Sequence, residues 1–157
     1  MRSKMLRAMA VIGLTVALSG CSADQFAAWL RAAGGNPDQY SKAELEYGAA
    51  IATQLWQTYL AEWQDLTKFD WVLSDGSLAR LRQCESGGNY HIVSPGGHYR
   101  GAYQFHRTTW NSVAGRHYPK YVGIDPAAAA PKIQDSMARA LFYEQGRGPW
   151  PHCGKLI

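Results

Sequence analysis

One carboxylate in this chain is surrounded by the residue types that a general acid requires. Glu85 directly follows Cys84, and a serine, two glycines and Asn89 come next. A glutamate in this setting could protonate the leaving oxygen of a glycosidic bond, provided that burial against apolar groups raises its pKa. We therefore predict that Glu85 is catalytic, in preference to the alternative of a solvated charge at the end of a helix.

Aromatic, amide and hydroxyl side chains follow Glu85 at several positions. Aromatic rings could stack on the apolar faces of sugar rings, while amide and hydroxyl groups could hydrogen-bond to sugar substituents. Tyr90 and Phe105 are candidates for the apolar wall that would raise the pKa of Glu85. The candidate substrate-binding residues are Tyr103, Gln104, Thr109, Trp110, Gln145 and Trp150.

The elements that must position these residues are predicted to be short helices. Residues 74–77 have the composition of a helix cap, and the glycines after Ser86 are expected to end the helix that carries Glu85. Further helices are predicted over residues 108–114 and 127–143.

A turn at residues 95–97 separates two extended pieces, residues 90–93 and 99–103, which could form a small hairpin or an irregular ribbon. The predicted fold class is therefore mainly α, with at most a short hairpin, in a small catalytic domain over residues 71–157.

Residues 21–70 are predicted to form a helical segment ahead of that domain. A short amphipathic piece over residues 25–33 stops at a Gly-Gly-Asn-Pro breaker, and a capping box at Ser41 and Glu44 starts a long helix that runs to about Lys68. An apolar stripe on the long helix would pack against the catalytic domain or a second helix. The alternative is a helix that contacts a partner or a membrane surface.

Residues 1–20 are predicted to be a signal peptide rather than part of the fold. Basic residues precede an uncharged apolar run over residues 8–18, which is too short to span a bilayer. Residues 18–21, Leu-Ser-Gly-Cys, resemble a lipobox, the bacterial site of lipoprotein processing. Cys21 would then become the first mature residue and carry a lipid that anchors the protein to the membrane. The alternative is an ordinary secretory signal; either way, the mature protein is expected outside the cytoplasm.

The cysteine count fits an exported protein. The chain has 3 cysteines. If Cys21 is acylated, Cys84 and Cys153 are left to pair, as an exported compartment allows. The alternative is two free buried thiols. A bridge would tie the backbone next to Glu85 to the segment that contains Trp150.

Charge is unevenly distributed along the chain, which is 46% hydrophobic and 18% charged and so is expected to be globular. Residues 22–70 carry three basic and seven acidic groups, a net charge of −4, whereas residues 71–157 carry ten basic and five acidic groups, a net charge of +5. A basic catalytic segment suits an anionic polymer such as a cell wall. Nucleic acid would suit the charge but not the compartment, so no nucleic-acid partner is predicted.

The order and spacing of these motifs resemble the catalytic domain of the resuscitation-promoting factors, a lysozyme-like family that cuts bacterial peptidoglycan. The resemblance covers roughly residues 71–154. The family's catalytic Glu, between a Cys and a small-Gly-Gly-Asn run, matches residues 84–89, and its Gly-Gly-x-Gln-Phe segment matches residues 101–105. Its Thr-Trp pair matches residues 109–110, and its closing Gln and Trp-Pro-x-Cys run matches residues 145–153.

The resemblance implies an α+β lysozyme-like fold, a bridge between Cys84 and Cys153, and glycan strands of peptidoglycan as the substrate. Glu85 would act on the β-1,4 bond between N-acetylmuramic acid and N-acetylglucosamine. It would protonate the leaving oxygen and then deprotonate the muramyl 6-hydroxyl, which attacks the anomeric carbon and leaves an anhydro product. Hydrolysis by a positioned water remains open.

A second catalytic carboxylate is not evident in the sequence. Asp75 precedes Glu85 by about three helical turns, Asp125 lies in a turn that is expected to cap a helix, and Glu144 has no motif support. A single acid suits lytic transglycosylation.

The chain departs from the family pattern in three places. His106 stands where many members carry an acidic residue, the loop over residues 94–100 is about one residue longer, and residues 116–131 do not follow the familiar pattern. These departures concern the substrate preference more than the reaction.

No metal or cofactor is predicted. The five histidines lie in the second half of the chain, but no His-Glu-x-x-His run is present and their spacings carry no metal-binding pattern. His98 or His106 could line the sugar-binding cleft. The main alternative function is a lipoprotein that binds peptidoglycan without cleaving it, and a weaker one is a lipid-tethered structural protein.

Overall fold

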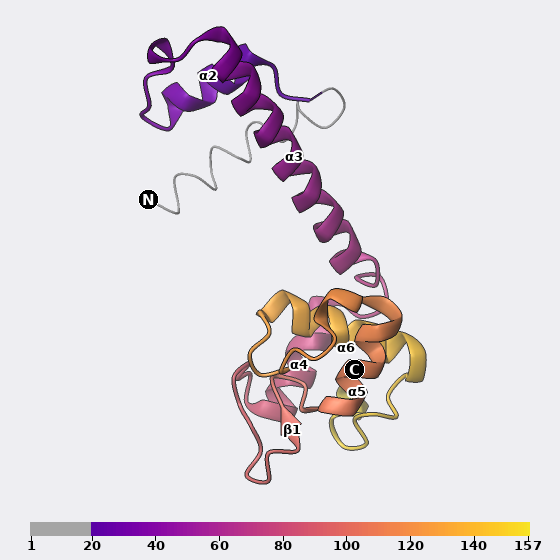
Figure 1. The fold of residues 1–157 in the computed structure, drawn as a ribbon. Coiled ribbons are helices and arrows are strands. Elements are labelled where there is room, and N and C mark those ends of the chain that lie inside the picture. Colours follow the sequence, from indigo (N-terminus) through magenta and orange to yellow (C-terminus); the bar gives the residue numbers. More distant parts are fainter. Residues whose placement is uncertain (1–19) are drawn as a thin grey trace. The chain divides into compact units, whose positions relative to one another are not determined.

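Local capping signals set where the helices of this protein begin. The computed structural model describes residues 20–157, so the predicted signal peptide lies outside the described residues apart from Gly20. The chain divides into two units, Met1–Glu62 and Trp63–Ile157. Helices form most of the described chain, with one two-stranded antiparallel sheet in the second unit, which confirms the predicted mainly α fold class (Figure 1). Among the described residues, no helix is both long and apolar enough to cross a membrane.

Helices α2 (Ala23–Ala32) and α3 (Lys42–Thr67), in the part of the N-terminal segment that the structure describes, both start at a capping box. Helix α2 begins after Ser22, whose hydroxyl accepts a hydrogen bond from Gln25 N, while the Gln25 side chain accepts one from Ser22 N. This helix starts two residues before the predicted piece. Helix α3 begins at the predicted Ser41–Glu44 box, which is confirmed by reciprocal bonds of 2.7 and 3.3 Å.

Small residues let α2 and α3 pack closely. A Cβ atom on Gly48 would lie 2.3 Å from Phe26 Cε1, so only a residue without a side chain fits there. Ala27 and Ala49 are buried beside this contact. Part of the predicted apolar stripe on α3 thus faces a second helix, as one interpretation of the sequence expected. A 3₁₀ turn, η1 (Pro37–Gln39), connects α2 to α3.

Helix α4 (Asp75–Ser86) carries Glu85 in its last turn. Ser74 caps its start, because the serine hydroxyl accepts a hydrogen bond of 3.1 Å from Ser77 N. Gly87 ends it with a left-handed backbone (φ +64°), a conformation that glycine adopts without steric cost. Both predicted ends of this helix are confirmed.

The predicted ribbon between residues 90–93 and 99–103 is present in irregular form. Val93 forms an isolated bridge with Arg100, and backbone bonds run from Gly101 N to Ile92 O at 2.8 Å and from Ser94 N to Tyr99 O at 2.9 Å. The regular pairing of strand β1 (Tyr99–Arg100) with β2 (Phe105–His106) was not predicted. It forms because residues 101–104 make a turn, with positive φ angles at Gly101 (+76°) and Gln104 (+50°).

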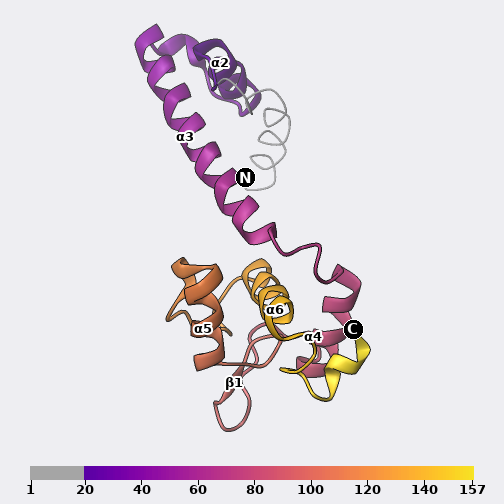
Figure 2. The ribbon, with the colours of Figure 1, turned by 90° about the vertical axis from the view of Figure 1, so that its right-hand side faces the viewer.

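Two further helices complete the second unit (Figure 2). Helix α5 (Arg107–His117) starts at His106, whose ring accepts a hydrogen bond from Thr108 N, and it extends beyond the predicted range at both ends. Helix α6 (Pro131–Gln145) begins four residues later than predicted, because Pro131 occupies its first turn, where the missing N–H costs nothing. The 3₁₀ turns η2 (Pro119–Tyr121) and η3 (Cys153–Leu156) follow α5 and α6 respectively.

The role of Asp125 in the structure differs from the predicted one. It was predicted to cap a helix, but its carboxylate binds the Arg100 guanidinium through two bonds of 2.6 Å and Arg107 at 2.9 Å. It also accepts a bond from Ala127 N in the turn before α6. Asp125 therefore anchors the hairpin and the start of α5 to this turn instead.

Aromatic and aliphatic side chains from α4, β2, α5, η2, α6 and η3 meet in one core. The α4 helix lies against η3, and α5 lies against α6. The core of the second unit includes Leu66, Leu73, Leu78, Leu81, Tyr103, Phe105, Trp110, Val113, Tyr118, Met137, Leu141, Trp150 and Cys153.

Replacing Gly101 with alanine tests how tightly the hairpin turn is packed. A Cβ atom there would lie 2.4 Å from Gln134 Oε1 and 3.1 Å from Pro126 O, and the φ of +76° disfavours any side chain. We expect Gly101→Ala to lower the free energy of unfolding by about 3 kcal/mol, because strain and overlap add. Urea unfolding would measure this difference.

Gly97→Ala is the matched control for that experiment. Gly97 has a similar φ of +73°, but no atom lies within 4 Å of the place that a Cβ atom would take, so this variant should lose only about 1 kcal/mol from backbone strain. Equal losses in the two variants would show that the contact with Gln134 contributes nothing.

Candidate active site

Glu85 is a half-buried carboxylate at the end of α4. Burial raises the pKa of the Glu85 carboxyl above its ordinary value, and the nearby charge of His152 opposes this rise. The burial effect is the larger of the two. Glu85 therefore keeps its proton to a higher pH than an exposed glutamate, as a general acid needs.

A disulfide joins the residue before Glu85 to the C-terminal segment. Cys84 and Cys153 are bonded with their Cα atoms 5.7 Å apart, across 69 positions of sequence. The predicted pairing is thus confirmed, and Cys21 is the free cysteine. Since Cys84 and Glu85 are adjacent, the bridge fixes the end of α4 relative to the segment that contains Trp150.

Three of the predicted substrate-binding residues lie in the core. Tyr103, Trp110 and Trp150 are each at most 4% exposed. The Trp150 indole donates a hydrogen bond of 3.0 Å to Tyr103 O, and the Trp110 indole donates one of 3.0 Å to Tyr121 O. Phe105 packs edge-on against both tryptophans. The three side chains are thus part of the core, and their contact with a saccharide stays a prediction.

The other three predicted residues lie at or near the surface. Gln104 is half-buried in the hairpin turn, where its amide donates a hydrogen bond of 2.9 Å to Gly101 O. Thr109 is half-buried in the first turn of α5, and Gln145 is the exposed last residue of α6. These side chains come from three different elements, and their contact with a ligand also stays a prediction.

Sequence reasoning missed the polar groups that hold the hairpin turn in place. The buried Gln134 accepts a hydrogen bond from Ala102 N at 2.8 Å and donates to Tyr90 O and Ala129 O. Asp135 accepts hydrogen bonds from the hydroxyls of Tyr90 at 2.8 Å and Tyr103 at 2.6 Å. No local motif distinguishes these two residues from other polar positions of α6, so only the tertiary contacts identify them.

Burial, together with the hydrogen bonds to Asp135, raises the pKa of both tyrosines. Burial is the main cause that raises the pKa of Tyr90 to about 12, and the hydrogen bond to Asp135 adds to it. Arg82 completes the cluster: its guanidinium donates to the Tyr103 hydroxyl at 3.4 Å and lies 5.8 Å from the centre of the Tyr90 ring. The cluster links α4, the Tyr90 segment, the hairpin turn and α6.

Glu144, the other carboxylate near the predicted motifs, has the opposite environment. It binds Arg116 through two bonds of 2.6 Å and His117 Nε2 at 2.6 Å. Arg116 is the main cause that lowers the pKa of the Glu144 carboxyl. Glu144 is therefore ionised near neutral pH and is not suited to donate a proton.

The histidines of the hairpin lie together on the surface. The rings of His98 and His106 are 6.4 Å apart and nearly parallel, and Tyr99 meets His106 edge-on. Within residues 20–157, no three His, Cys, Asp or Glu side chains converge in a way that could hold a metal ion.

Comparison with known proteins identifies a family for the second unit. The model of the family described as "Transglycosylase-like domain" matches residues 74–153. The proteins named "Probable transglycosylase SceD" from Staphylococcus aureus strains Newman, Mu3 and USA300 are each 44% identical over 73 residues. That match covers 46% of this chain and 30% of each relative, so the chain spans less than a third of the length of these relatives.

Reduction tests the contribution of the disulfide. Breaking the bond between Cys84 and Cys153 frees the unfolded chain to adopt more conformations, so the free energy of unfolding should fall by about 2–5 kcal/mol. Urea unfolding with and without reductant measures the loss. Cys21→Ser is the control, since it removes the free thiol and should leave the stability of the second unit unchanged. Free alkylation of Cys84 and Cys153 in the native protein would contradict the assignment.

Glu144→Gln should lower stability in a pH-dependent way without removing any catalytic group. The folded-state pKa of Glu144 is depressed, so its ion pair stabilises the fold above the ordinary glutamate pKa of about 4.3 and is lost as the pH falls further. We expect the variant to lose about 1 kcal/mol at pH 7, with the difference shrinking at acid pH. A difference that grew at acid pH would contradict this account. Denaturant unfolding of both proteins, from pH 7 down to below the ordinary glutamate pKa of about 4.3, provides the measurement.

Proposed function

The chain belongs to the family of transglycosylase-like domains, and on this premise we propose that it cleaves the glycan strands of peptidoglycan as a lytic transglycosylase. The proposed bond is the β-1,4 linkage between N-acetylmuramic acid and N-acetylglucosamine. The observation that carries the proposal is the half-buried carboxyl of Glu85, whose pKa is raised by burial. The resemblance to the resuscitation-promoting factors, residue by residue around Glu85, supports the same reaction.

In the first half of the reaction, protonated Glu85 gives its proton to the glycosidic oxygen. The bond between that oxygen and the anomeric carbon breaks, and positive charge develops at the carbon. The acetamido group of the substrate is a suitable internal group to stabilise this charge. The proton donor must be neutral beforehand, which the burial of Glu85 favours.

In the second half, the Glu85 carboxylate takes the proton of the muramyl 6-hydroxyl. The freed oxygen attacks the anomeric carbon of the same sugar, so the product ends in a 1,6-anhydro ring and no water is consumed. Glu85 returns to its protonated form. One carboxyl group thus serves both steps, and the reaction needs no second carboxylate.

The pairing of the other acidic residues in the domain supports a single acid. Asp125 and Glu144 each bind arginines, and Asp135 accepts bonds from two tyrosines. Asp75 is exposed and pairs with Arg139 at the opposite end of α4 from Glu85. Each of these carboxylates has a structural role that accounts for its position.

We further propose that Gln104, Thr109 and Gln145 hydrogen-bond to the sugar substituents and that Tyr103, Trp110 and Trp150 shape the apolar wall behind them. Their order in the chain matches the saccharide-binding pattern of the resembling family. The excess of basic groups in residues 71–157 suits an anionic polymer.

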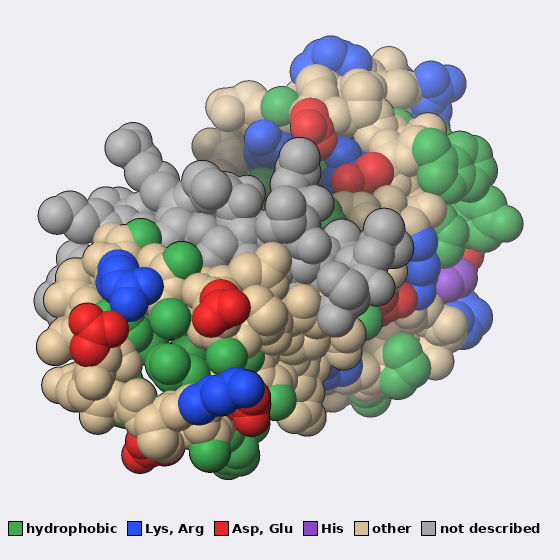
Figure 3. Space-filling view, turned by 90° about the horizontal axis from the view of Figure 1, so that it is seen from above, with side chains coloured by type: hydrophobic (Ala, Val, Ile, Leu, Met, Phe, Trp, Pro, Cys, Tyr) green, Lys and Arg blue, Asp and Glu red, His purple; other side chains and the backbone are tan. Residues whose placement is uncertain are grey.

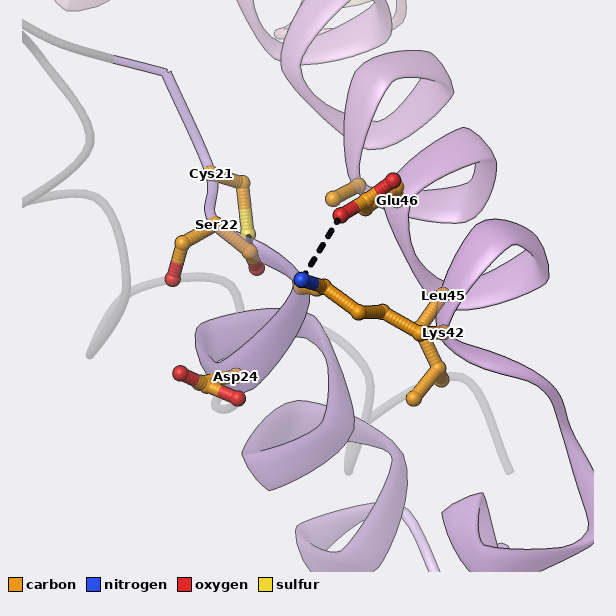
Figure 4. A pocket seen from close by; sticks show the side chains of 8 residues that line it. Cys21, Ser22, Asp24, Lys42, Leu45 and Glu46 are labelled. Atoms are coloured by element: carbon orange, nitrogen blue, oxygen red, sulfur yellow. Dashed lines mark hydrogen bonds and ion pairs between the residues drawn. The ribbon is translucent and has the colours of Figure 1, made fainter.

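A lipid tether on Cys21 is the second element of the proposal. Cys21 follows Leu-Ser-Gly in a lipobox-like run and stands immediately before α2. Its backbone N–H donates a hydrogen bond of 2.8 Å to Thr53 Oγ1, which ties the start of the mature chain to α3. Together with Lys42 and Glu46 it lines a hollow of about 630 Å³ (Figure 4). Figure 3 shows one face of the N-terminal unit. On it, hydrophobic side chains lie in a hollow and charged side chains surround them.

Replacing the proposed acid is the direct test of the function. Glu85→Gln keeps the size of the side chain but removes the proton donor, so wall digestion should fall by at least about 10²-fold while the fold is retained. Release of soluble fragments from purified cell walls measures the rate, and circular dichroism checks the fold. Glu144→Gln is the control and should keep most of the activity. Near-normal digestion by Glu85→Gln would overturn the assignment, and binding to walls without any digestion by the wild-type protein would favour a non-catalytic binding lipoprotein.

A lipid on Cys21 predicts that the protein is found in the membrane fraction. Wild-type protein should partition into membranes and detergent, and its N-terminal peptide should carry the mass of a diacylglyceryl group on Cys21. Cys21→Ser should abolish that mass and stop lipoprotein processing. A mature protein that starts elsewhere and carries no lipid would show that the lipobox interpretation is wrong.

A further inference from the structure

Arg82 is a partly exposed arginine one helical turn before the candidate acid. Both residues belong to α4, and Arg82 precedes Glu85 by three positions. Residues at this spacing share one side of a helix, with their Cβ atoms about 5–6 Å apart. A ligand that brings a bond to the Glu85 carboxyl therefore also comes within reach of the Arg82 side chain.

The guanidinium of Arg82 is held along one edge only. Its Nη1 atom donates a hydrogen bond of 3.4 Å to the Tyr103 hydroxyl, and its Cζ atom lies 5.8 Å from the centre of the Tyr90 ring. The carboxylate of Asp135 accepts hydrogen bonds from both tyrosine hydroxyls and forms no ion pair with Arg82. Within residues 20–157, no acceptor is hydrogen-bonded to the Nε or Nη2 atom of Arg82. The edge formed by these two atoms is thus left for a ligand.

This arrangement distinguishes Arg82 from the other arginines of residues 71–157, all of which the structure describes. A guanidinium is always charged and carries five N–H donors, so it favours carboxylate or carbonyl acceptors. Each of the others has such an oxygen within 2.9 Å: Arg100, Arg107 and Arg116 bind carboxylates, and Arg80, Arg139 and Arg147 bind backbone carbonyls. Arg82 has only a hydroxyl at 3.4 Å.

We propose that Arg82 binds a carboxylate of the substrate beside the bond that Glu85 breaks. The inference rests on the proposed function of Glu85. An open guanidinium edge matches a carboxylate, which accepts two parallel N–H bonds. The lactyl ether of a muramyl sugar begins two ring carbons from the anomeric carbon, so its carboxyl end lies on the order of 5 Å from the breaking bond, about one helical turn. That span matches the step along α4 from Glu85 to Arg82.

The carboxylate has two sources in a cell wall. Where no peptide is attached, it is the lactyl carboxyl itself. Where the lactyl carboxyl is already an amide, it is a carboxyl group of the peptide stem. In both cases Arg82 makes the domain prefer an anionic muramyl glycan to a neutral one, and it acts on binding, not on the proton transfers of Glu85.

The experiment measures the binding of short soluble muramyl glycans to the full chain, with Glu85→Gln present throughout so that the ligand is not cut. Isothermal titration calorimetry gives the Kd for glycans in three forms. The first carries peptide stems with free carboxyl groups, the second has lost its stems and has free lactyl carboxyl groups, and the third has every carboxyl group converted to an amide.

Arg82→Gln should raise the Kd for a carboxylate form by about 10-fold, the scale of a hydrogen bond to a charged group, and leave the Kd for the amide form unchanged. Arg82→Lys should have an intermediate effect, because it keeps the charge but not the planar fork. The amide form also serves as the check that each variant retains an intact binding surface.

Arg80→Gln is the matched control. Arg80 carries the same charge two positions earlier on α4, and residues at that spacing do not face each other. It is exposed and binds Leu156 O and Ser77 Oγ. This variant should leave all three Kd values unchanged.

A loss confined to the carboxylate forms in Arg82→Gln, with none in Arg80→Gln, supports the inference, and the form that shows the loss identifies the source of the carboxylate. An equal loss for all three forms would be a structural disturbance, and equal losses in the two arginine variants would be a general effect of net charge; either result, or no loss, overturns it. The proposed function is judged separately by wall digestion: protein with Glu85 intact that releases no fragments refutes the enzyme, whatever Arg82 binds.

Discussion

The disulfide between Cys84 and Cys153 is the constraint on which the arrangement of the site depends. It closes a loop of 69 positions, and limiting the unfolded chain to this extent stabilises a fold by about 4 kcal/mol in the chain-entropy account. That amount matters in a small unit, whose core is limited. The bridge also fixes the last turn of α4 against the turn that holds Trp150. The backbone next to Glu85 is therefore held in place by a covalent bond.

Environment rather than residue type separates the candidate acid from the other carboxylates. Burial raises the pKa of Glu85, whereas Arg116 lowers that of Glu144 and Arg100 lowers that of Asp125. The pKa values of two glutamates on different helices are thus moved in opposite directions. The hydrogen bonds of Gln134 and Asp135 hold the hairpin turn and Tyr103 in place. Tyr103 O in turn accepts the hydrogen bond of the Trp150 indole.

The features that the sequence predicted well are those decided by neighbours in the chain. Ser74 and Gly87 bound α4, and Ser41 with Glu44 starts α3, because capping bonds join residues only a few positions apart. The cysteine count and the family resemblance both predicted the disulfide. The features that the sequence missed depend on distant contacts: the pairing of β1 with β2 and the binding of Asp125 to Arg100. The burial of Trp110 likewise follows from packing between elements, which no local pattern reveals.

The central claim is that one carboxyl group cleaves the glycan by making the substrate's own hydroxyl the nucleophile. The most direct test is mass spectrometry of the fragments that the wild-type protein releases from peptidoglycan in ¹⁸O-labelled water. The account predicts muramyl ends that lack one water relative to a reducing sugar and that contain no ¹⁸O. Reducing muramyl ends that carry ¹⁸O would show that solvent water is the nucleophile and would contradict the account.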